Sequence, residues 1–118
     1  MMKRIVLVED DAPVRDVLHI VFDESDYDII DMENGKGIMD DEIDCPDLFI
    51  LDRQLSGTNG LDVCRHIKSS EKFKDIAVIM LSASPDIDLL AKEAGANAAI
   101  KKPFSLKNLR ELVAQYVA

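Results

Sequence analysis

Polar residues that could do chemistry stand directly after four short apolar runs. The runs and the groups that end them are residues 5–8 before Glu9 and Asp10, 48–51 before Asp52, 76–81 before Ser82, and 98–100 before Lys101 and Lys102. If the runs are parallel strands of one sheet, these groups meet at a single edge of that sheet. Because clustered carboxylates repel one another, such an edge is costly to assemble for stability alone and indicates a functional site.

The chemistry that these residue types favour is the binding of a hard metal ion. Converging carboxylates need a cation, and Mg2+ suits them because it prefers oxygen ligands and keeps several waters. Glu9, Asp10 and Asp52 could supply carboxylates, and the backbone carbonyl of Gln54 could supply another oxygen. A site with so few protein ligands is open to a phosphate oxygen.

The elements that must position these groups alternate along the chain. We expect strands at 5–8, 27–32, 48–51, 76–81 and 98–100, and helices at 13–23, 36–44, 61–67, 85–94 and after Ser105. The alternation predicts a (βα)5 fold of the α/β class, a doubly wound, flavodoxin-like parallel sheet of five strands. Runs that are apolar on both faces belong in its centre, so the strand order 2-1-3-4-5 is expected. The switch point of that order lies between the first and third strands, where Glu9, Asp10 and Asp52 stand.

Smaller signals refine the elements. Residues 56–60 are expected to form a loop, and Ser105 is expected to cap the last helix. Gly95 is expected to end the preceding helix by adopting a left-handed backbone conformation. That last helix is expected to bury Leu106, Leu109, Val113, Tyr116 and Val117. Asp10 or Asp11 could cap the first helix instead of serving as a ligand, and for Asp11 capping is the favoured interpretation.

Other reactive side chains have structural explanations. Cys64 lies on the apolar face of a predicted helix and is expected in the core, while His19 and His66 lack a nucleophile partner in the pattern. The acidic stretch around 40–44 is expected to be a solvated surface.

The composition bounds the class of protein. The chain has 118 residues, 47% of them hydrophobic, and a net charge of -9. We expect one domain over 1–118, no direct binding to nucleic acid because phosphate contacts need clustered Lys and Arg, and no membrane span. Two cysteines without metal-ligand spacing fit a reduced, cytoplasmic protein.

Five motifs in order along the chain carry a family resemblance. They are Val8-Glu9-Asp10-Asp11 with Pro13, residues 47–52 with Gly57 and Gly60, Ser82-Ala83, Gly95-Ala96, and Lys102-Pro103-Phe104. With these motifs the chain resembles a response-regulator receiver domain of two-component signalling, over essentially its whole length.

The resemblance implies a role for each strand-end residue. Asp52 would accept a phosphoryl group from a phosphohistidine on a sensor histidine kinase or a histidine phosphotransfer protein. Glu9 and Asp10 would hold Mg2+ together with Asp52, Lys102 would neutralise phosphoryl charge, and Ser82 would donate its hydroxyl to a phosphoryl oxygen. The resemblance also implies a cis peptide bond before Pro103.

Some positions depart from the family or vary within it. Ala99 stands where the family usually has an aromatic switch residue, so the output surface of the fourth helix, fifth strand and fifth helix is expected to be altered. The segment from Ser82 to Lys102 is about two residues short, and Ser56 stands where proline is common. Gln54 and Ser84 occupy positions that tune phosphate lifetime, and their polar, uncharged side chains favour an intermediate lifetime.

The function that we predict from the sequence is a phosphorylation-activated signalling switch and not an enzyme, since it acts only on its own phosphorylation and dephosphorylation. It would pass its state to an unknown downstream protein, as a monomer or a weak phosphorylation-dependent dimer without an output domain. One alternative is a phosphorylation-independent adaptor with the same fold. A Mg2+-dependent phosphatase with an aspartate nucleophile is less favoured, because Arg53 and Gln54 follow Asp52 where that class needs a second Asp.

Overall fold

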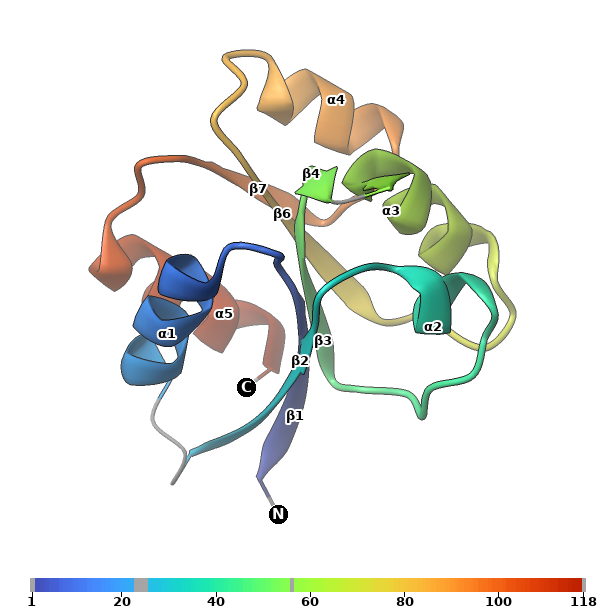
Figure 1. Ribbon diagram of the computed structural model, residues 1–118, viewed down its shortest axis with the longest axis horizontal. Helices are drawn as coiled ribbons and strands as arrows, with labels where there is room; N and C mark the ends of the chain where they lie inside the picture. The colour runs from blue at the N-terminus through green and yellow to red at the C-terminus, as the bar shows by residue number, and fades with distance from the viewer. Residues whose placement is uncertain (1, 23–25, 56, 118) are drawn as a thin grey trace.

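Strands and helices alternate along the chain in the computed structural model, which describes residues 2–22, 26–55 and 57–117 (Figure 1). The strands are β1 (Lys3–Val8), β2 (Tyr27–Met32), β3 (Leu48–Asp52), β4 (Gln54–Leu55), β5 (Thr58–Asn59), β6 (Ala77–Ser82) and β7 (Ala98–Lys101). The helices are α1 (Ala12–Val21), α2 (Lys36–Met39), α3 (Gly60–Ser69), α4 (Ile87–Glu93) and α5 (Leu106–Val117).

The main sheet has five parallel strands in the order β2-β1-β3-β6-β7. Counted without the two-residue strands β4 and β5, this is the predicted order 2-1-3-4-5, and the predicted fold class is confirmed. Helices α1 and α5 cover one face of the sheet, and α2, α3 and α4 cover the other (Figure 1).

The core forms two layers because successive strand residues point to opposite faces. Ile5, Leu48 and Ile50 pack towards α1 and α5, while Val6 and Phe49 pack towards α3 and α4. Every residue of β3 is buried, which explains its uninterrupted apolar run. The two strands with polar or short sequences, β2 and β7, are the edges, as expected.

Several boundaries differ from the sequence prediction. Helix α1 begins at Ala12 and ends at Val21, before the predicted limit at 23. Helix α2 ends at Met39 and does not reach 44, because Asp41 adopts a left-handed backbone conformation with φ 55° and breaks the helix. Helix α4 begins at Ile87, two residues late, since the N–H of Ile87 closes a turn onto the carbonyl of Ser84.

The predicted loop at 56–60 is more ordered than expected. Thr58 and Asn59 form the strand β5, which pairs antiparallel with β4, and Asn59 then caps α3 by accepting a hydrogen bond from the N–H of Leu61. Ser56, which stands where proline is common in the family, lies outside the described residues. The hairpin ties the segment after β3 to the start of α3.

The smaller helix signals are mostly confirmed. Gly95 has φ 88°, Cys64 is fully buried, and Ser105 caps α5 by accepting a hydrogen bond from the N–H of Asn108. The expected burial of Leu106 is wrong, because this first residue of α5 is 43% exposed beside α1. No helix within the described ranges is long and apolar enough to cross a membrane.

Candidate functional site

The carboxyl ends of β1, β3, β6 and β7 open onto one cavity of about 180 Å³. Its lining residues are Glu9, Asp10, Asp11, Asp52, Gln54, Ser82, Ala83 and Lys102. Parallel strands bring their ends to the same edge, so groups that are far apart in the sequence converge here. The structure therefore brings together the strand-end residues that the sequence singled out.

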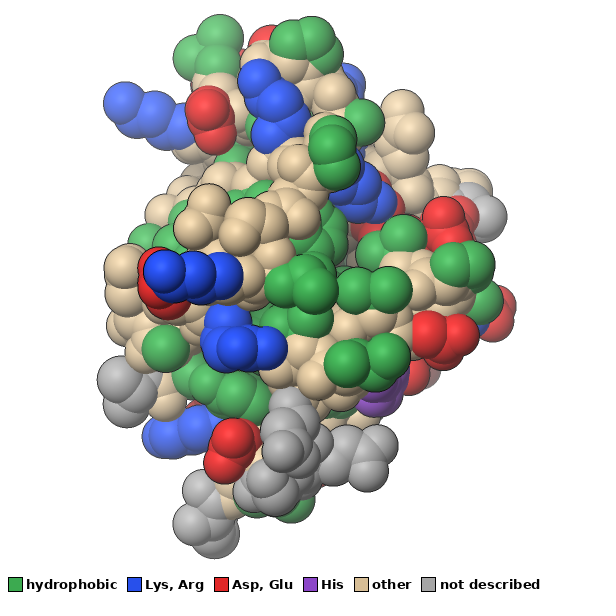
Figure 2. Space-filling view, turned by 90° about the vertical axis from the view of Figure 1, so that its left-hand side faces the viewer, with side chains coloured by type: hydrophobic (Ala, Val, Ile, Leu, Met, Phe, Trp, Pro, Cys, Tyr) green, Lys and Arg blue, Asp and Glu red, His purple; other side chains and the backbone are tan. Residues whose placement is uncertain are grey.

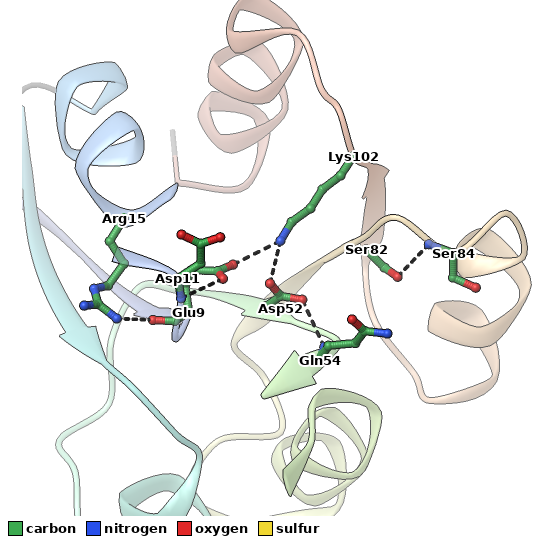
Figure 3. Close-up of polar contacts among 8 residues, drawn as sticks. All are labelled: Glu9, Asp11, Arg15, Asp52, Gln54, Ser82, Ser84 and Lys102. Carbon is green, nitrogen blue, oxygen red and sulfur yellow. Dashed lines mark hydrogen bonds and ion pairs between the residues drawn. The ribbon is translucent and has the colours of Figure 1, made fainter. Parts of the chain in front are cut away.

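Asp52 is the centre of the site. It is the last residue of β3, lies opposite Leu81 of β6, and is 5% exposed. Its Oδ1 accepts a hydrogen bond of 3.0 Å from the N–H of Gln54, and its Oδ2 lies 2.5 Å from Nζ of Lys102 (Figure 3). One carboxylate oxygen is thus held by the chain that follows it, and the other by a cation.

Lys102 crosses the end of β6 to reach this carboxylate. Its N–H donates to the carbonyl of Ser82, which fixes the backbone after β7, and the bond before Pro103 is cis, as the resemblance implies. Its Nζ also lies 3.3 Å from Oε2 of Glu9. The ammonium group is therefore shared between two carboxylates from different strands.

Glu9 is buried at the end of β1 and is held by several contacts. Its N–H donates to the carbonyl of Met32, and its Oε1 accepts a hydrogen bond of 3.2 Å from the N–H of Asp11. Its own carbonyl accepts a hydrogen bond of 2.7 Å from Nη1 of Arg15 (Figure 3). Sequence reasoning missed Arg15. A basic residue one turn into a helix that follows an acidic loop is the signal that could have found it.

Burial and charge make the two carboxylates unequal. Burial, and then the neighbouring carboxylate of Asp52, raise the pKa of Glu9 to about 8. Burial also acts to raise the pKa of Asp52, but its hydrogen bonds with Glu9, Lys102 and the N–H of Gln54 outweigh it and lower that pKa. Burial works to lower the pKa of Lys102, whereas its contacts with Asp52 and Glu9 raise it. Near neutral pH the charged pair is therefore Asp52 and Lys102, and Glu9 holds a proton.

Ser82 and Ser84 flank the cavity from the β6 side. Ser82 is buried, and its Oγ accepts a hydrogen bond of 3.0 Å from the N–H of Ser84 (Figure 3). Because Ser82 is the acceptor in this contact, its hydroxyl hydrogen can still be donated to another acceptor. The hydroxyl of Ser84 donates to the carboxylate of Asp86, so Ser84 points towards the start of α4.

Gly60 allows α3 to pack closely against the backbone of Asp52. A Cβ atom at this position would lie 2.0 Å from the carbonyl oxygen of Asp52 and 2.8 Å from Cα of Arg53. The N–H of Gly60 donates to the carbonyl of Arg53 at 2.7 Å. The first residue of α3 is therefore packed directly on the backbone that carries Asp52.

Residues 5–114 match the family described as Response regulator receiver domain. The chain belongs to this family. It is 37% identical over 119 residues to the phosphate regulon transcriptional regulatory protein PhoB of Pseudomonas aeruginosa PAO1, covering 98% of this chain and 51% of that protein. It is 34% identical over 112 residues to PhoB of Escherichia coli K12, covering 92% of this chain and 49% of that protein. The chain spans about half the length of these relatives.

Solved receiver structures share the fold of this receiver domain. A putative response regulator from Chloroflexus aurantiacus J-10-fl has a TM-score of 0.89 at 26% identity, covering 99% of this chain and 98% of that one. The receiver domain of the sensor histidine kinase PA1611 from Pseudomonas aeruginosa PAO1 has a TM-score of 0.87 at 22% identity, with the same coverages. That second structure has a magnesium ion coordinated in its active site cleft. The family is one of signalling domains in two-component systems.

The donors in this receiver domain fit a hard dication by their chemistry. Carboxylates of Glu9, Asp10 and Asp52 line one small cavity, and oxygen is the donor that Mg2+ prefers. Within the described residues, no three His, Cys, Asp or Glu side chains already stand grouped around a metal position. The ammonium group of Lys102 lies between Glu9 and Asp52 and contacts both.

Two other sequence predictions have different outcomes. Asp11 occupies the N-cap position of α1, but its side chain makes no capping hydrogen bond, so the capping prediction for its carboxylate is wrong. Ala99 lies opposite Met80 in the sheet, and hollows of about 320 and 380 Å³ adjoin it, both bordered by Asp88 of α4. The small side chain thus leaves open space at the surface where the family usually has an aromatic residue.

An apolar groove adjoins the cavity on the side of α1. It is lined by Pro13, Val14, Val17, Lys102, Pro103, Phe104 and Leu106. Figure 2 shows hydrophobic side chains gathered in the middle of this face, with Lys and Arg side chains to the left and above and Asp and Glu side chains to the right. The exposure of Leu106 follows from its place in this groove.

Proposed function

We propose that this receiver domain is a phosphorylation-activated switch whose phosphoacceptor is Asp52. The observation that carries the proposal is the state of this carboxylate. It is buried at a strand end, has a lowered pKa, and is in contact with the ammonium group of Lys102. An ionised carboxylate at the floor of a cavity that a phosphoryl group can enter is a suitable nucleophile.

The proposed transfer step moves one phosphoryl group. An Asp52 carboxylate oxygen attacks the phosphorus of a phosphohistidine, and the new O–P bond forms as the P–N bond breaks. The leaving imidazole nitrogen keeps the electron pair of that bond and takes up a proton from solvent. The donor would be a sensor histidine kinase or a histidine phosphotransfer protein. The apolar groove lined by Val17, Phe104 and Leu106 supports a protein donor, because such a surface fits a protein partner beside the cavity.

Charge neutralisation and positioning are what this chemistry requires. Mg2+, which we propose is held by Glu9, Asp10, Asp52 and the carbonyl of Gln54, would neutralise phosphoryl charge when bound. Lys102 would exchange its contact with the free carboxylate for one with the phosphoryl group. Ser82 would turn its hydroxyl hydrogen towards a phosphoryl oxygen while keeping the N–H of Ser84 as its donor.

We further propose that the phosphorylated state is passed to a downstream protein through α4, β7 and α5 without an aromatic switch. The hollows beside Ala99 support an altered route, because this position has no side chain that could move between two orientations. We also propose that the protein is cytoplasmic and that it is a monomer or a weak phosphorylation-dependent dimer.

The test is covalent phosphorylation by a small donor. The purified chain is mixed with phosphoramidate and MgCl2, and its intact mass is measured over time. We expect a mass increase of one phosphoryl group that is absent in Asp52→Asn. Asp62→Asn is the matched control, because Asp62 is an exposed aspartate of α3 that pairs with Arg65 away from the cavity. If the wild type gains no phosphoryl group, the adaptor function is favoured instead.

A further inference from the structure

Arg15 contacts the site through the backbone carbonyl of Glu9. Its guanidinium extends from the first turns of α1, and Nη1 donates to the carbonyl of Glu9 at 2.7 Å (Figure 3). We propose that Arg15 is a positioning residue that fixes the peptide unit between Glu9 and Asp10, and thereby sets the geometry of the acidic pair for Mg2+. The inference rests on the proposed function of that pair.

The planarity of the peptide bond gives this contact its effect. The carbonyl oxygen of Glu9 lies in the same plane as the nitrogen and Cα of Asp10. Holding that oxygen therefore restricts the direction in which the Asp10 side chain leaves the backbone. On its other side the Glu9 backbone is fixed by the sheet, through the hydrogen bond from its N–H to the carbonyl of Met32. The contact of Arg15 fixes the carbonyl side of the Glu9 backbone.

The contact can persist while the site changes its occupants. The carboxylate oxygens of Glu9 accept hydrogen bonds from Lys102 and from the N–H of Asp11. A cation that binds these oxygens competes with both donors. Arg15 uses the carbonyl oxygen instead, so it does not compete with the cation. The side-chain charges that shift the pKa of Glu9 are those of Asp52 and Lys102, and the contact of Arg15 is with the backbone carbonyl of this residue.

Isothermal titration with MgCl2 tests the assignment directly. Arg15→Met keeps the length of the side chain but removes its donors, and Arg15→Lys keeps one charged donor. We expect the Mg2+ dissociation constant to rise about 10-fold in Arg15→Met, as for other residues that orient metal ligands, and to recover in part in Arg15→Lys. Arg65→Met is the matched control, because Arg65 is an exposed helix arginine that pairs only with Asp62 among the contacts of the described residues. Its dissociation constant should equal that of the wild type.

The rate of phosphorylation by phosphoramidate gives a second measurement. Arg15→Met should need more Mg2+ than the wild type but reach the same rate at saturating Mg2+, because Asp52 and Lys102 are intact. If Arg15 served only the stability of the fold, its loss would lower the melting temperature and leave the Mg2+ affinity of the folded protein unchanged. That result overturns the positioning role while the proposed function stands. A wild type that binds no Mg2+ overturns both.

Discussion

Nζ of Lys102 lies 2.5 Å from Oδ2 of Asp52, although β7, which Lys102 follows, and β3, which Asp52 ends, are not neighbours in the sheet. Strand β6 separates them, and the lysine side chain spans its end. The same ammonium group lies 3.3 Å from Glu9 at the end of β1. One cation thus contacts two buried carboxyl groups from separate strands, and its removal should affect both.

Replacement of Lys102 by Met should destabilise the metal-free protein. Two buried carboxyl groups would lose their cation. Breaking a buried pair costs about 3–5 kcal/mol, and we expect the lower end because the lysine is partly exposed. Because Mg2+ can supply the missing charge, the variant should regain more stability from MgCl2 than the wild type does. Urea unfolding with EDTA or MgCl2 measures both effects. Lys101→Met, at the exposed neighbouring lysine, is the control, and equal losses in the two variants would contradict the pairing.

Glu9→Gln should remove part of the pH dependence of stability. The pKa of Glu9 is raised from 4.5 to about 8 in the folded chain, so between these values the folded state holds a proton that the unfolded state releases. This group therefore stabilises the fold fully below the lower value, and its contribution is lost as the pH rises towards the higher one. The pKa of Asp52 is lowered from 3.8 and that of Lys102 is raised from 10.5. These two groups therefore change the stability only below about pH 3.8 and above about pH 10.5.

The measurement is urea unfolding of both proteins in EDTA at several pH values within that window. The wild type should lose stability relative to Glu9→Gln as the pH rises. All other titratable groups are common to both proteins, so their contributions cancel in the difference. Parallel curves would show that Glu9 does not hold the extra proton.

The sheet and the cluster of strand ends could be predicted because both depend on patterns along single strands. A run that is apolar on both faces, such as 48–51, belongs in the centre of a parallel sheet, and its next residue then lies at the ligand edge. The exposure of Leu106 and the contact of Arg15 with Glu9 could not be predicted in this way. Both depend on where α1 lies relative to β1 and α5, which helical spacing alone does not determine.

Gly60→Ala should disturb the site through the backbone. The added Cβ would lie 2.0 Å from the carbonyl oxygen of Asp52, so either α3 or the end of β3 must move. We expect a loss of about 1–3 kcal/mol of stability together with slower phosphorylation by phosphoramidate.

Gly57→Ala is the matched comparison for this substitution. Gly57 has φ 75°, and an added Cβ would meet no atom within 4 Å, so the cost there is conformational, about 1 kcal/mol, and remote from Asp52. Phosphorylation of Gly57→Ala should stay close to the wild-type rate. Equal rates in the two variants would mean that the packing of α3 on Asp52 does not position the carboxylate.

Gln54→Ala should lengthen the life of the phosphorylated form. The side chain of Gln54 is exposed at the cavity, where it could orient the water that attacks the phosphoryl group. Loss of one neutral hydrogen bond of about 1 kcal/mol would slow decay roughly 5-fold. Ser84→Ala should have a smaller effect, because the Ser84 hydroxyl is bonded to Asp86. Decay followed by intact mass tests this, and an unchanged rate in Gln54→Ala would exclude a water-orienting role.

Ala99→Tyr should leave the fold stable and should place a fluorescent tyrosine at the surface formed by α4, β7 and α5. Hollows of about 320 and 380 Å³ adjoin this position, both bordered by Asp88 of α4, so an aromatic ring has room on the α4 face of β7, and stability should change by less than about 1 kcal/mol. The chain has no Trp and two Tyr residues, so tyrosine fluorescence is readable. We expect phosphoramidate with MgCl2 to change the fluorescence of the variant more than that of the wild type, because the ring can move between the two hollows. The same change in a double variant with Asp52→Asn would show that it does not report phosphorylation. A stability loss of several kcal/mol would show instead that the hollows cannot accept the ring.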